Sequence, residues 1–451
     1  MASQEDRERS AAWRRGRRTL HRSCSDGMRR AAWLVLLFLG CVVWLLYVIA
    51  TVDDRTRALA LVRQRVGGDL EPSAEDAEWS RRRATLAKSI SPLANWLLSR
   101  EGSAPPAKTT NRSEPFVILV WQHGPFLERR HLRRFSRDNT FSPWEGCSVQ
   151  NCRLTYAASR LHSADAVIFH LHRTANARSL PRRENPDQRW IFLSDESPPN
   201  TFLLRNQSLE DYDGLFNWSM TYRIDSDVPV PYGRTVLRDK VDDKFNARDI
   251  VAEKTRLVAV LGSNCAGQNG RWEYVAKLKS ILGEDLAILG HCQNGDSSAC
   301  PGHFEADCAA LSRFKFYLAF ENSNCREYLT EKVFWNAYGK RAVPVIMGAR
   351  RSDCELLLPP RSYLHVDDFA DAASLASRLR YLGGGGAAAE YARLHAWRAR
   401  YRVLDEHGYF GSASRHYCRV CEALNYAERP RARKVYRRLA DFWSTRAHCR
   451  H

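Results

Sequence analysis

The sequence predicts an α/β protein with two parallel sheets, attached to a membrane through its N-terminus. Three observations support this fold class. The chain has 451 residues, which is too long for one ordinary hydrophobic core. Short β-branched apolar runs alternate with helical patterns over most of its length, as in proteins that bury a parallel sheet between helices. One uncharged stretch near the start is long enough to cross a bilayer.

The uncharged stretch covers residues 31–52 and reads AAWLVLLFLGCVVWLLYVIATV. As a helix it would span the ~30 Å hydrocarbon core. A cleaved signal peptide would have a shorter apolar run and a small-residue cleavage site. Residues 1–30 carry nine Arg against four acidic residues and are expected to stay cytoplasmic as a tail. We therefore expect a type II signal anchor that places the rest of the chain in a lumen or outside the cell.

Two further features agree with a lumenal body. Eleven cysteines follow the membrane segment, in a compartment where disulfides persist. Three N-x-S sequons offer glycosylation sites at Asn111, Asn206 and Asn217. Residues 53–112, which are charged and broken by EPSAED and GSAPPAKTT, are expected to form a part helical, part flexible stem.

Two groups of apolar runs predict the two sheets of the body. The first group belongs to a domain over residues 113–240 and the second to a domain over residues 255–405. A polar segment over 234–254 is expected to link them. The runs cover 116–121, 164–170, 189–194, 256–262, 315–320 and 342–348.

The net charge of +18 raises the question of a polyanionic partner. Most of the 69 basic residues are Arg, and they are scattered among Asp and Glu rather than gathered in a stripe. No nucleic-acid-binding motif accompanies them. We therefore do not expect nucleic acid as a partner.

Ligands of open α/β sheets bind beyond the carboxyl ends of the strands, so the loops after the apolar runs are candidate sites. In RWIFLSDESPP, Asp195 and Glu196 directly follow a buried strand. Neighbouring side chains of an extended segment point opposite ways, so only one of the two is expected to face a given cleft. A carboxylate there could take a proton from a sugar hydroxyl. The stretch alone does not decide between this role and a solvated turn closed by Pro198 and Pro199.

The segment LVAVLGSNCAGQNGRWEYVAKL predicts a strand, a Gly- and Asn-containing loop and then a helix over residues 271–282. Val275, Leu278 and Leu282 share one face of that helix. Free N–H groups at the helix start, together with the charge of Arg271, suit a phosphate group.

The segment KFYLAFENSNCREYLTEK likewise predicts a strand followed by a polar loop. Asn322, Tyr328, Glu331 and Lys332 lie in or just past this loop. A nucleotide-sugar site needs such a mixture: amide or carboxylate partners for ribose and base, an aromatic face, and a cation for the departing diphosphate.

The run F-E-N-S-x-C-x-x-Y-x-T-E-K, followed by V-P-V and a Gly, resembles the signature of the α1,3-fucosyltransferase family. WIFLSDESP, FNWSMTYRIDSDVPVPYG and SNCAGQNGR are similar to further family segments, so that the resemblance extends from about residue 116 to 421. The SNC loop with its Arg and the FENSNC variant look most like the branch that modifies the innermost GlcNAc of N-glycans.

The resemblance implies a GT-B fold, in which two Rossmann-like domains face a cleft. It implies a Golgi membrane glycoprotein whose lumenal body acts as a hexosyltransferase-type enzyme. The expected reaction transfers L-fucose from GDP-fucose, with inversion, to the 3-hydroxyl of a GlcNAc in N-glycans on glycoproteins. It implies no required cofactor and leaves stimulation by a divalent cation open.

The resemblance also implies roles for single residues. Glu196 matches the general base, which favours it over Asp195. Arg271 and Lys332 match the cations at the diphosphate. The donor-contacting positions of the family are matched by Asn322, Tyr328 and Glu331. Two departures stand out: Glu327 replaces the usual Asp, and residues 338–341 replace a small-residue stretch.

Two motifs suggest other chemistry. Asp225 and Asp227 form a D-x-D motif, whose two carboxylates can bind a divalent cation together with a diphosphate. Because this pair lies away from the donor segments, we expect a structural role.

Cys418 and Cys421 could be redox-active or, with Cys147 and Cys152, form a zinc site. A lumenal position favours disulfides, and the resemblance implies that the tail over residues 406–451 returns to the first domain by pairing these two cysteine pairs. A bond between Cys265 and Cys325 is a further hypothesis, since both follow strand ends.

Two alternatives to a core-type enzyme remain. A Lewis-type α1,3-fucosyltransferase would perform the same chemistry on LacNAc. A non-catalytic lumenal glycan-binding protein would keep the fold without activity, but the intact set of Glu196, Arg271, Glu331 and Lys332 argues against it.

Overall fold

The computed structural model describes residues 74–133, 142–183, 185–203, 207–301, 306–408, 414–427 and 434–450. These residues belong to one compact unit that begins at Pro72. The expected cytoplasmic tail and membrane helix lie outside the described residues. Within the described part of the chain, no helix combines the length and apolar character needed to span a membrane.

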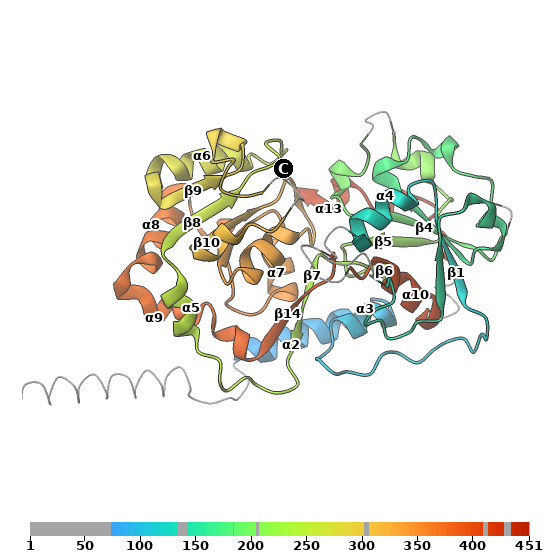
Figure 1. The fold of residues 1–451 in the computed structure, drawn as a ribbon, viewed down its shortest axis with the longest axis horizontal. Coiled ribbons are helices and arrows are strands. Elements are labelled where there is room, and N and C mark those ends of the chain that lie inside the picture. Colours follow the sequence, from blue (N-terminus) through green and yellow to red (C-terminus); the bar gives the residue numbers. More distant parts are fainter. Residues whose placement is uncertain are drawn as a thin grey trace, which may run out of the picture. The chain divides into compact units, whose positions relative to one another are not determined.

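The first half of the unit is built on a parallel sheet of six strands (Figure 1). Their order is β2-β1-β3-β4-β5-β6, so the chain starts near one edge and moves across the sheet. Every residue of β3 is buried, as expected for a strand covered on both faces. The strands are β1 (Phe116–Val120), β2 (Cys152–Thr155), β3 (Ala166–His170), β4 (Arg189–Ser194), β5 (Trp218–Thr221) and β6 (Val228–Pro229).

The second half is built on a parallel sheet of five strands in the order β13-β12-β10-β8-β9. Helices α6 and α8 pack on it, with Leu278 of α6 and Leu375 of α8 completely buried in the same apolar cluster. The strands are β8 (Arg256–Leu261), β9 (Leu286–Leu289), β10 (Phe314–Phe320), β12 (Val343–Met347) and β13 (Leu364–His365). The helices are α5 (Ala247–Glu253), α6 (Arg271–Leu282), α7 (Arg351–Leu357), α8 (Ala372–Gly383) and α9 (Ala388–Arg393).

All six predicted apolar runs are strands of these two sheets, and the predicted helix over residues 271–282 is α6. Its expected face is confirmed, because Val275, Leu278 and Leu282 are buried. Sequence reasoning missed the strands β2, β5, β6, β9 and β13. These have only two to four residues, so a periodic pattern has no length in which to develop.

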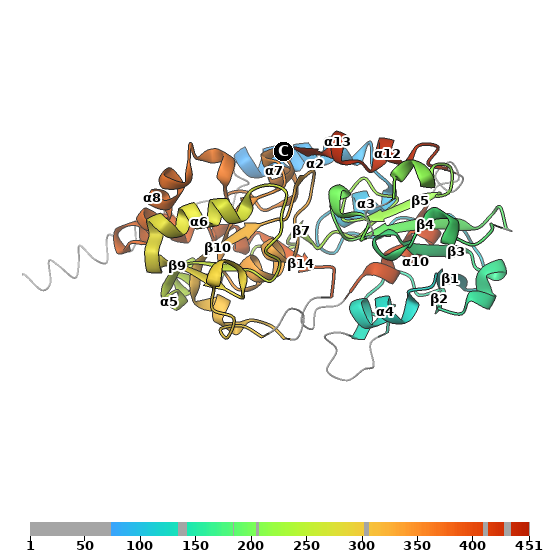
Figure 2. The same ribbon diagram turned by 90° about the horizontal axis from the view of Figure 1, so that it is seen from above.

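An antiparallel pair joins segments that are far apart in sequence. β7 (Gly233–Leu237), which follows the first sheet, pairs with β14 (Tyr401–Asp405), which follows the second. After β14 the chain returns to the first sheet, where α10 (His416–Tyr426) lies against β1 (Figure 2). The expectation that the C-terminal segment comes back to the first domain therefore holds for α10.

Five disulfides join cysteines of the described residues. Cys147–Cys418 and Cys152–Cys421 tie α10 to the first half, as the resemblance implied.

The hypothesis of a Cys265–Cys325 bond is wrong, because Cys265 pairs with Cys292 and Cys325 with Cys449. The second of these bonds accompanies a short antiparallel pair, β11 (Asn324–Cys325) with β15 (Cys449–Arg450). The chain end thus lies on the second half rather than the first.

Part of the expected stem belongs to the folded body. In α2 (Ala74–Ala87), Trp79 is buried and its indole N–H donates to Leu358 O at 3.0 Å. Arg83 is buried as well and donates to the carbonyls of Leu98 and Thr235. The following helix α3 (Pro92–Leu97) packs against α10. The segment is rich in charged residues, so its composition resembles that of a solvated stem. Composition therefore does not reveal that Trp79 is buried or that Arg83 donates to buried carbonyls.

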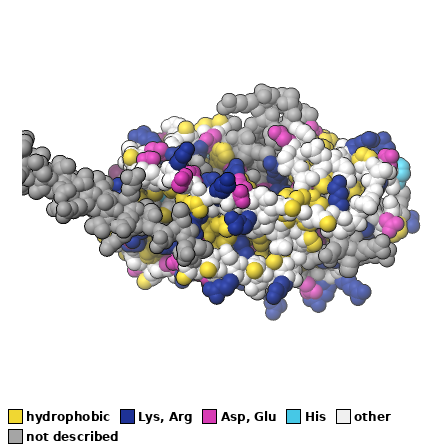
Figure 3. Space-filling view, turned by 90° about the horizontal axis from the view of Figure 1, so that it is seen from below, with side chains coloured by type: hydrophobic (Ala, Val, Ile, Leu, Met, Phe, Trp, Pro, Cys, Tyr) yellow, Lys and Arg dark blue, Asp and Glu magenta, His cyan; other side chains and the backbone are white. Residues whose placement is uncertain are grey.

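Charged side chains are distributed over the surface rather than concentrated by sign. On the face drawn in Figure 3, Lys and Arg are interspersed with Asp and Glu over the described residues. Several basic residues are paired, including Arg82 with Glu78, Arg351 with Asp368 and Arg380 with Asp285. This distribution agrees with the expectation that the positive net charge is a compositional property of the chain.

Candidate active site

A cavity of about 330 Å³ lies between the two halves of the unit. Glu196 and Tyr232 line it from the first half, whereas the loops after β8, β9 and β10 line it from the second. The carboxyl ends of strands β4, β8 and β10 therefore meet at this cavity, as expected for open parallel sheets. All six residues with predicted catalytic or donor-binding roles line it: Glu196, Arg271, Asn322, Tyr328, Glu331 and Lys332.

Glu196 lies two residues after the end of β4 and is half-buried. Its carboxylate oxygen Oε2 accepts a hydrogen bond from Tyr328 Oη at 3.3 Å. Its backbone carbonyl accepts one from Ser194 Oγ at 3.0 Å. Glu196 is thus held at the cavity wall by one hydrogen bond to its side chain and one to its backbone.

Asp195 does not face the cavity. Its side chain is 2% exposed and is directed toward the imidazole of His416, whose Nε2 lies 3.1 Å from Asp195 Oδ1. The two neighbouring carboxylates therefore point to opposite sides of an extended segment, as the sequence suggested. The structure assigns the cavity to Glu196.

Lys332 begins the π-helix η10 (Lys332–Gly339) and sits between two carboxylates. Its Nζ lies 3.1 Å from Glu321 Oε2 and 3.1 Å from Glu331 Oε1. Burial opposes the charged form, but these two carboxylates outweigh it and raise the pKa of Lys332. Lys332 therefore stays a fixed cation at the cavity wall.

Glu321 has no solvent exposure and is the centre of this arrangement. It accepts hydrogen bonds from the backbone N–H of Thr330 at 2.9 Å and from Thr330 Oγ1 at 2.8 Å. Burial raises the pKa of Glu321, an effect that Lys332 partly offsets. Sequence reasoning gave Glu321 no role, although the letter E in FENS directly follows a buried strand and was the available signal.

Arg271 begins α6 and is 5% exposed. Its guanidinium donates to Phe320 O at 3.2 Å, to Asn264 O at 2.6 Å and to Ala266 O at 2.6 Å. Burial lowers the pKa of Arg271 from a very high ordinary value, so the group keeps its charge. Arg271 therefore shapes the loop after β8 as well as bringing a positive charge to the cavity.

The loop after β10 is joined to the segment that carries Glu196. Ser323 Oγ donates to Ser197 Oγ at 2.6 Å, and both side chains are buried. The neighbouring Asn322 lines the cavity, and its backbone carbonyl accepts from Gln268 N at 3.2 Å. The loop that carries Glu196 and the expected donor loop are thus in direct contact.

Glu327, which departs from the family pattern, connects the two halves. Its Oε2 accepts from the backbone N–H of Ile224 at 2.7 Å, and its Oε1 lies 2.9 Å from Arg326 Nη2. Burial and then the nearby Asp225 raise the pKa of Glu327 to about 7. The longer side chain reaches the first half, which explains why Glu is accommodated here. Residues 338–341, the other departure, are not among the described residues that line the cavity.

The D-x-D pair is occupied by protein groups, in line with the structural role expected for it. Asp225 is 3.1 Å from Arg326 Nη1. Asp227 Oδ2 accepts from Tyr436 Oη at 2.7 Å, and Lys434 Nζ lies 3.1 Å from both of its oxygens. Both carboxylates are already neutralised by fixed cations, and neither lines the cavity.

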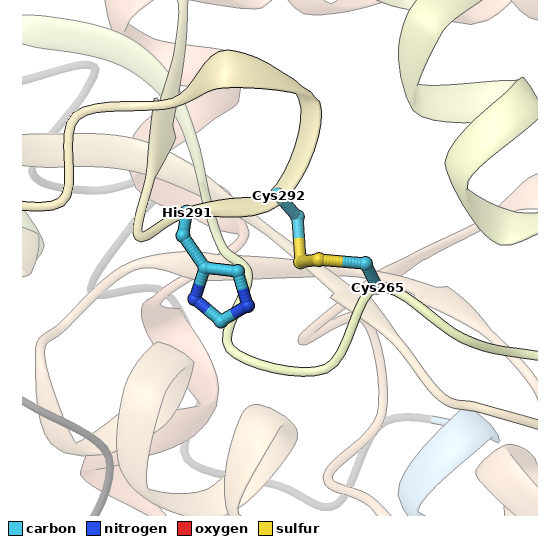
Figure 4. A group of neighbouring side chains, drawn as sticks. All are labelled: Cys265, His291 and Cys292. Atoms are coloured by element: carbon cyan, nitrogen blue, oxygen red, sulfur yellow. A yellow bond between two sulfur atoms is a disulfide. The ribbon is translucent and has the colours of Figure 1, made fainter.

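A disulfide stands at the edge of the cavity (Figure 4). Cys265 follows β8 and Cys292 follows β9, and the His291 imidazole lies beside the bond. Cys265, His291 and Cys292 have the residue types of a metal site. However, the two sulfurs are bonded to each other and are not the thiolates that metals require. The bond instead fixes two cavity-lining loops, which contain Ser263 and His291.

The sequons differ in their surroundings. Asn111 is exposed. Asn217 is 4% exposed, and its side chain accepts from Trp190 N at 2.9 Å and donates to Lys434 O at 2.9 Å. Asn206 lies outside the described residues. A glycan on Asn217 would require these buried hydrogen bonds to be broken.

Comparisons with known proteins identify the family of the chain. Residues 113–233 match the family described as "Fucosyltransferase, N-terminal", and residues 251–443 match "Glycosyltransferase family 10 (fucosyltransferase) C-term". The chain is 33% identical over 364 residues to α-(1,3)-fucosyltransferase 7 of Mus musculus, which covers 79% of this chain and 83% of the relative.

It is also 33% identical over 300 residues to glycoprotein 3-α-L-fucosyltransferase A of Drosophila melanogaster, which covers 66% of this chain and 55% of the relative. A crystal structure of an α1,3-fucosyltransferase aligns with a TM-score of 0.43 at 16% identity and covers 75% of this chain and 98% of that chain. The two family matches together span most of the chain, and the mouse relative is matched over most of its length. The chain therefore belongs to the α1,3-fucosyltransferases of glycosyltransferase family 10.

Proposed function

We propose that this enzyme transfers L-fucose from GDP-fucose to the 3-hydroxyl of a GlcNAc in N-glycans, with inversion at the fucose anomeric carbon. The observation that carries the proposal is the arrangement of charge around one cavity. The Glu196 carboxylate lies at the wall contributed by the first half, and Lys332 and Arg271 lie at the wall contributed by the second. A base and fixed cations on opposed walls are what an in-line displacement of a diphosphate needs.

In the proposed reaction, Glu196 takes the proton of the acceptor hydroxyl as its oxygen attacks the anomeric carbon. A bond forms between that oxygen and the carbon, while the bond from the carbon to the diphosphate oxygen breaks. The electron pair of the broken bond leaves with GDP, whose added negative charge Lys332 and Arg271 stabilise. Tyr328 holds the Glu196 carboxylate toward the cavity through its hydrogen bond.

For the acceptor, we infer the innermost GlcNAc of N-glycans. The similarity to the fly glycoprotein 3-α-L-fucosyltransferase A supports this choice. A second candidate is a Lewis-type acceptor, supported by similarity to the 4-galactosyl-N-acetylglucosaminide 3-α-L-fucosyltransferase FUT6 of Pan troglodytes, at 35% identity over 327 residues. The two candidates share the donor and the chemistry and differ only in the sugar that carries the accepting hydroxyl.

For the cellular location, we propose a single-pass type II protein of the Golgi membrane with a lumenal catalytic body. The uncharged stretch over residues 31–52 and the arginine-rich tail before it support this topology. The disulfides of the body suit an oxidising lumen.

The test uses the full-length enzyme, solubilised in detergent, with radiolabelled GDP-fucose. It is offered a GlcNAc-terminated N-glycan, LacNAc and a peptide O-glycan in separate reactions. Label in the N-glycan core supports the proposal, label in LacNAc alone supports the Lewis-type alternative, and no label from well-folded enzyme contradicts both.

The role of the base is tested by Glu196→Gln. We expect transfer to fall by about two to four orders of magnitude while GDP-fucose still binds. A variant that binds the donor and transfers at a near-normal rate would show that Glu196 is not the base.

A further inference from the structure

Asp195, the residue before the proposed base Glu196, makes buried contacts that have no part in the proposed reaction. Its carboxylate is buried and does not line the cavity, and it lies among five basic side chains, of which Arg130 also lines the cavity. They come from η1 (Arg129–Arg133), from the end of β3, from the segment after β14 and from α10. The five are Arg130, His131, His170, His407 and His416.

Two imidazoles contact the Asp195 carboxylate directly. His416 Nε2 lies 3.1 Å from Oδ1, and His131 Nε2 lies 3.4 Å from Oδ2. The two rings are stacked, with centroids 3.6 Å apart and planes 12° apart. Ser414 Oγ lies 3.0 Å from His416 Nδ1, which leaves the Nε2–H of that ring to donate to the carboxylate.

Burial and the neighbouring groups together determine which side chains around Asp195 are charged. Burial opposes ionisation of the carboxyl, but the neighbouring groups, His416 first, outweigh it and hold the pKa of Asp195 well below its usual value. Burial lowers the pKa of His131 and His170 far below the ordinary value and that of His407 to about 3. The carboxylate is therefore ionised, and these three rings are neutral.

A metal ion is the other use that this group of side chains suggests, since His131, Asp195 and His416 could together offer three ligands. Two features disfavour it. Arg130 Nη2 lies 3.6 Å from the same Asp195 Oδ2 that would bind the ion, and a guanidinium repels a second cation there. The two imidazoles also lie face to face, whereas ligands of one tetrahedral ion spread apart around it.

The same segment is fixed at each of its residues. Tyr232 Oη donates to the backbone carbonyl of Asp195 at 3.0 Å. Ser194 Oγ donates to the backbone carbonyl of Glu196 at 3.0 Å, and Ser197 Oγ accepts from Ser323. The Asp195 side chain adds the anchor on the buried side, so the direction of the Glu196 side chain is set by contacts on both sides of the segment.

The anchor reaches Asp195 from a distant part of the chain. His416 is the first residue of α10, and the same helix carries Cys418 and Cys421. Their disulfides to Cys147 and Cys152 span 271 and 269 residues and hold α10 on the first half. Helix α10 thus places the imidazole donor of His416 on the buried side of the segment that carries Glu196.

We propose that Asp195 is a positioning residue, which through its contacts with His416 and His131 holds Glu196 in the orientation that deprotonates the acceptor. This inference rests on the proposed role of Glu196 as the base. Asp195 does not line the cavity, so its loss should lower the rate of the chemical step and leave donor binding intact. A displacement of the base by about 1 Å can cost up to 10²-fold in rate.

The experiment compares Asp195→Leu and Asp195→Asn in the full-length enzyme. Leu removes both acceptor oxygens, whereas Asn keeps one that can still accept from His416. We expect Asp195→Leu to lower kcat at least tenfold per GDP-binding site, with the Kd for GDP-fucose changed less than twofold. Asp195→Asn should recover a third or more of the wild-type kcat, which a loss of overall stability would not explain.

Asp227→Asn is the matched control, because it alters another buried carboxylate of the first half that lies away from the cavity. It should lower stability without changing kcat per binding site. If Asp195→Leu does not fold, His416→Phe removes the donor to Oδ1 together with the Ser414 contact, keeps a ring in place and carries the same expectation.

Three results would overturn the proposal. The first is a wild-type kcat per binding site in Asp195→Leu, and the second is a loss of GDP-fucose affinity in place of kcat. The third is one equivalent of metal per chain whose removal by a chelator abolishes activity. Fucose transfer by the wild type is measured first, so its absence would count against the proposed function and not against Asp195 alone.

Discussion

Tyr328 donates a hydrogen bond to the Glu196 carboxylate at 3.3 Å, although the two residues belong to different halves of the unit. The phenol comes from the loop after β10, and the carboxylate comes from the segment after β4. Since both line the same cavity, this contact joins the proposed base to the proposed donor loop. The relative position of the two halves therefore affects the orientation of the base.

Removing this phenol should impair catalysis more than folding. Tyr328→Phe is expected to lower kcat about tenfold, equivalent to about 1.4 kcal/mol, because a hydrogen bond to a charged group is lost. Steady-state kinetics with GDP-fucose and the preferred acceptor measure it. Tyr222→Phe is the matched control, since its ring lies 4.9 Å from that of Tyr328 and its buried hydroxyl has no hydrogen-bond partner in the part of the chain that the structure describes. Equal losses in both variants would contradict a specific role for Tyr328.

The disulfide between Cys265 and Cys292 should support donor binding. Replacing both cysteines with Ser is expected to raise the KM for GDP-fucose and to cost about 2–4 kcal/mol of stability, because two cavity-lining loops lose their connection. Donor titration and chemical unfolding measure the two effects. Cys354→Ala alters the buried cysteine that forms no disulfide among the described residues and should leave the KM unchanged. An unchanged KM for GDP-fucose in the double variant would show that this bond does not support donor binding.

The boundary of the folded body can be tested by truncation. Fused behind a cleavable signal peptide, a chain that begins at Pro72 should fold and be secreted, whereas one that begins at Ser113 should be poorly secreted, because it lacks α2 and α3. The buried Trp79 and the carbonyl contacts of Arg83 are the reason. Trp79→Ala in the longer chain should lower stability by about 3–5 kcal/mol, measured by urea unfolding. Comparable stability of the two truncated chains would show that residues 74–112 belong to the stem and not to the folded body.

His395 should make the protein sensitive to acid. Both of its ring nitrogens are buried without a hydrogen-bond partner among the described residues, and burial, with Arg398 and Lys254, holds its pKa far below the ordinary value. Since the unfolded chain binds this proton more readily, the contribution is complete above about pH 6.5 and is lost as the pH falls below it. At pH 5 the loss is about 2 kcal/mol.

The test compares unfolding at pH 7 and pH 5 in the wild type and in His395→Leu. The variant should lose about 2 kcal/mol less between the two values. Because each protein is compared with itself, any packing change from the substitution cancels. An equal loss in both proteins would show that His395 does not bind a proton on unfolding.

Glycan occupancy should follow burial. We expect a glycan on the exposed Asn111 and none on Asn217, whose amide is buried in hydrogen bonds to Trp190 and Lys434. Mass spectrometry of tryptic glycopeptides from the secreted enzyme measures both sites. Asn217→Ala should also reduce secretion, whereas Asn111→Gln should not destabilise the fold. A glycosylated Asn217 in active enzyme would contradict the observed packing.

The sequence by itself determined the long strands and the loops that line the cavity. Runs such as RWIFLS and KFYLAF carry enough apolar residues to specify a buried strand, and parallel strands place their following loops at one edge. Glu196, Asn322, Tyr328 and Lys332 could therefore be expected at one cavity, and the structure brings them together there.

Tertiary structure decided what depends on partners far away in sequence. Asp195 and Glu196 are adjacent and chemically alike, and only the arrival of His416 from α10 gives one of them a buried ionic role. Disulfide pairing likewise depends on where chain segments meet, which is why Cys325 bonds to Cys449 and not to Cys265. Local sequence carries propensity and periodicity, whereas burial and ion pairing are properties of surroundings that form only when distant segments pack.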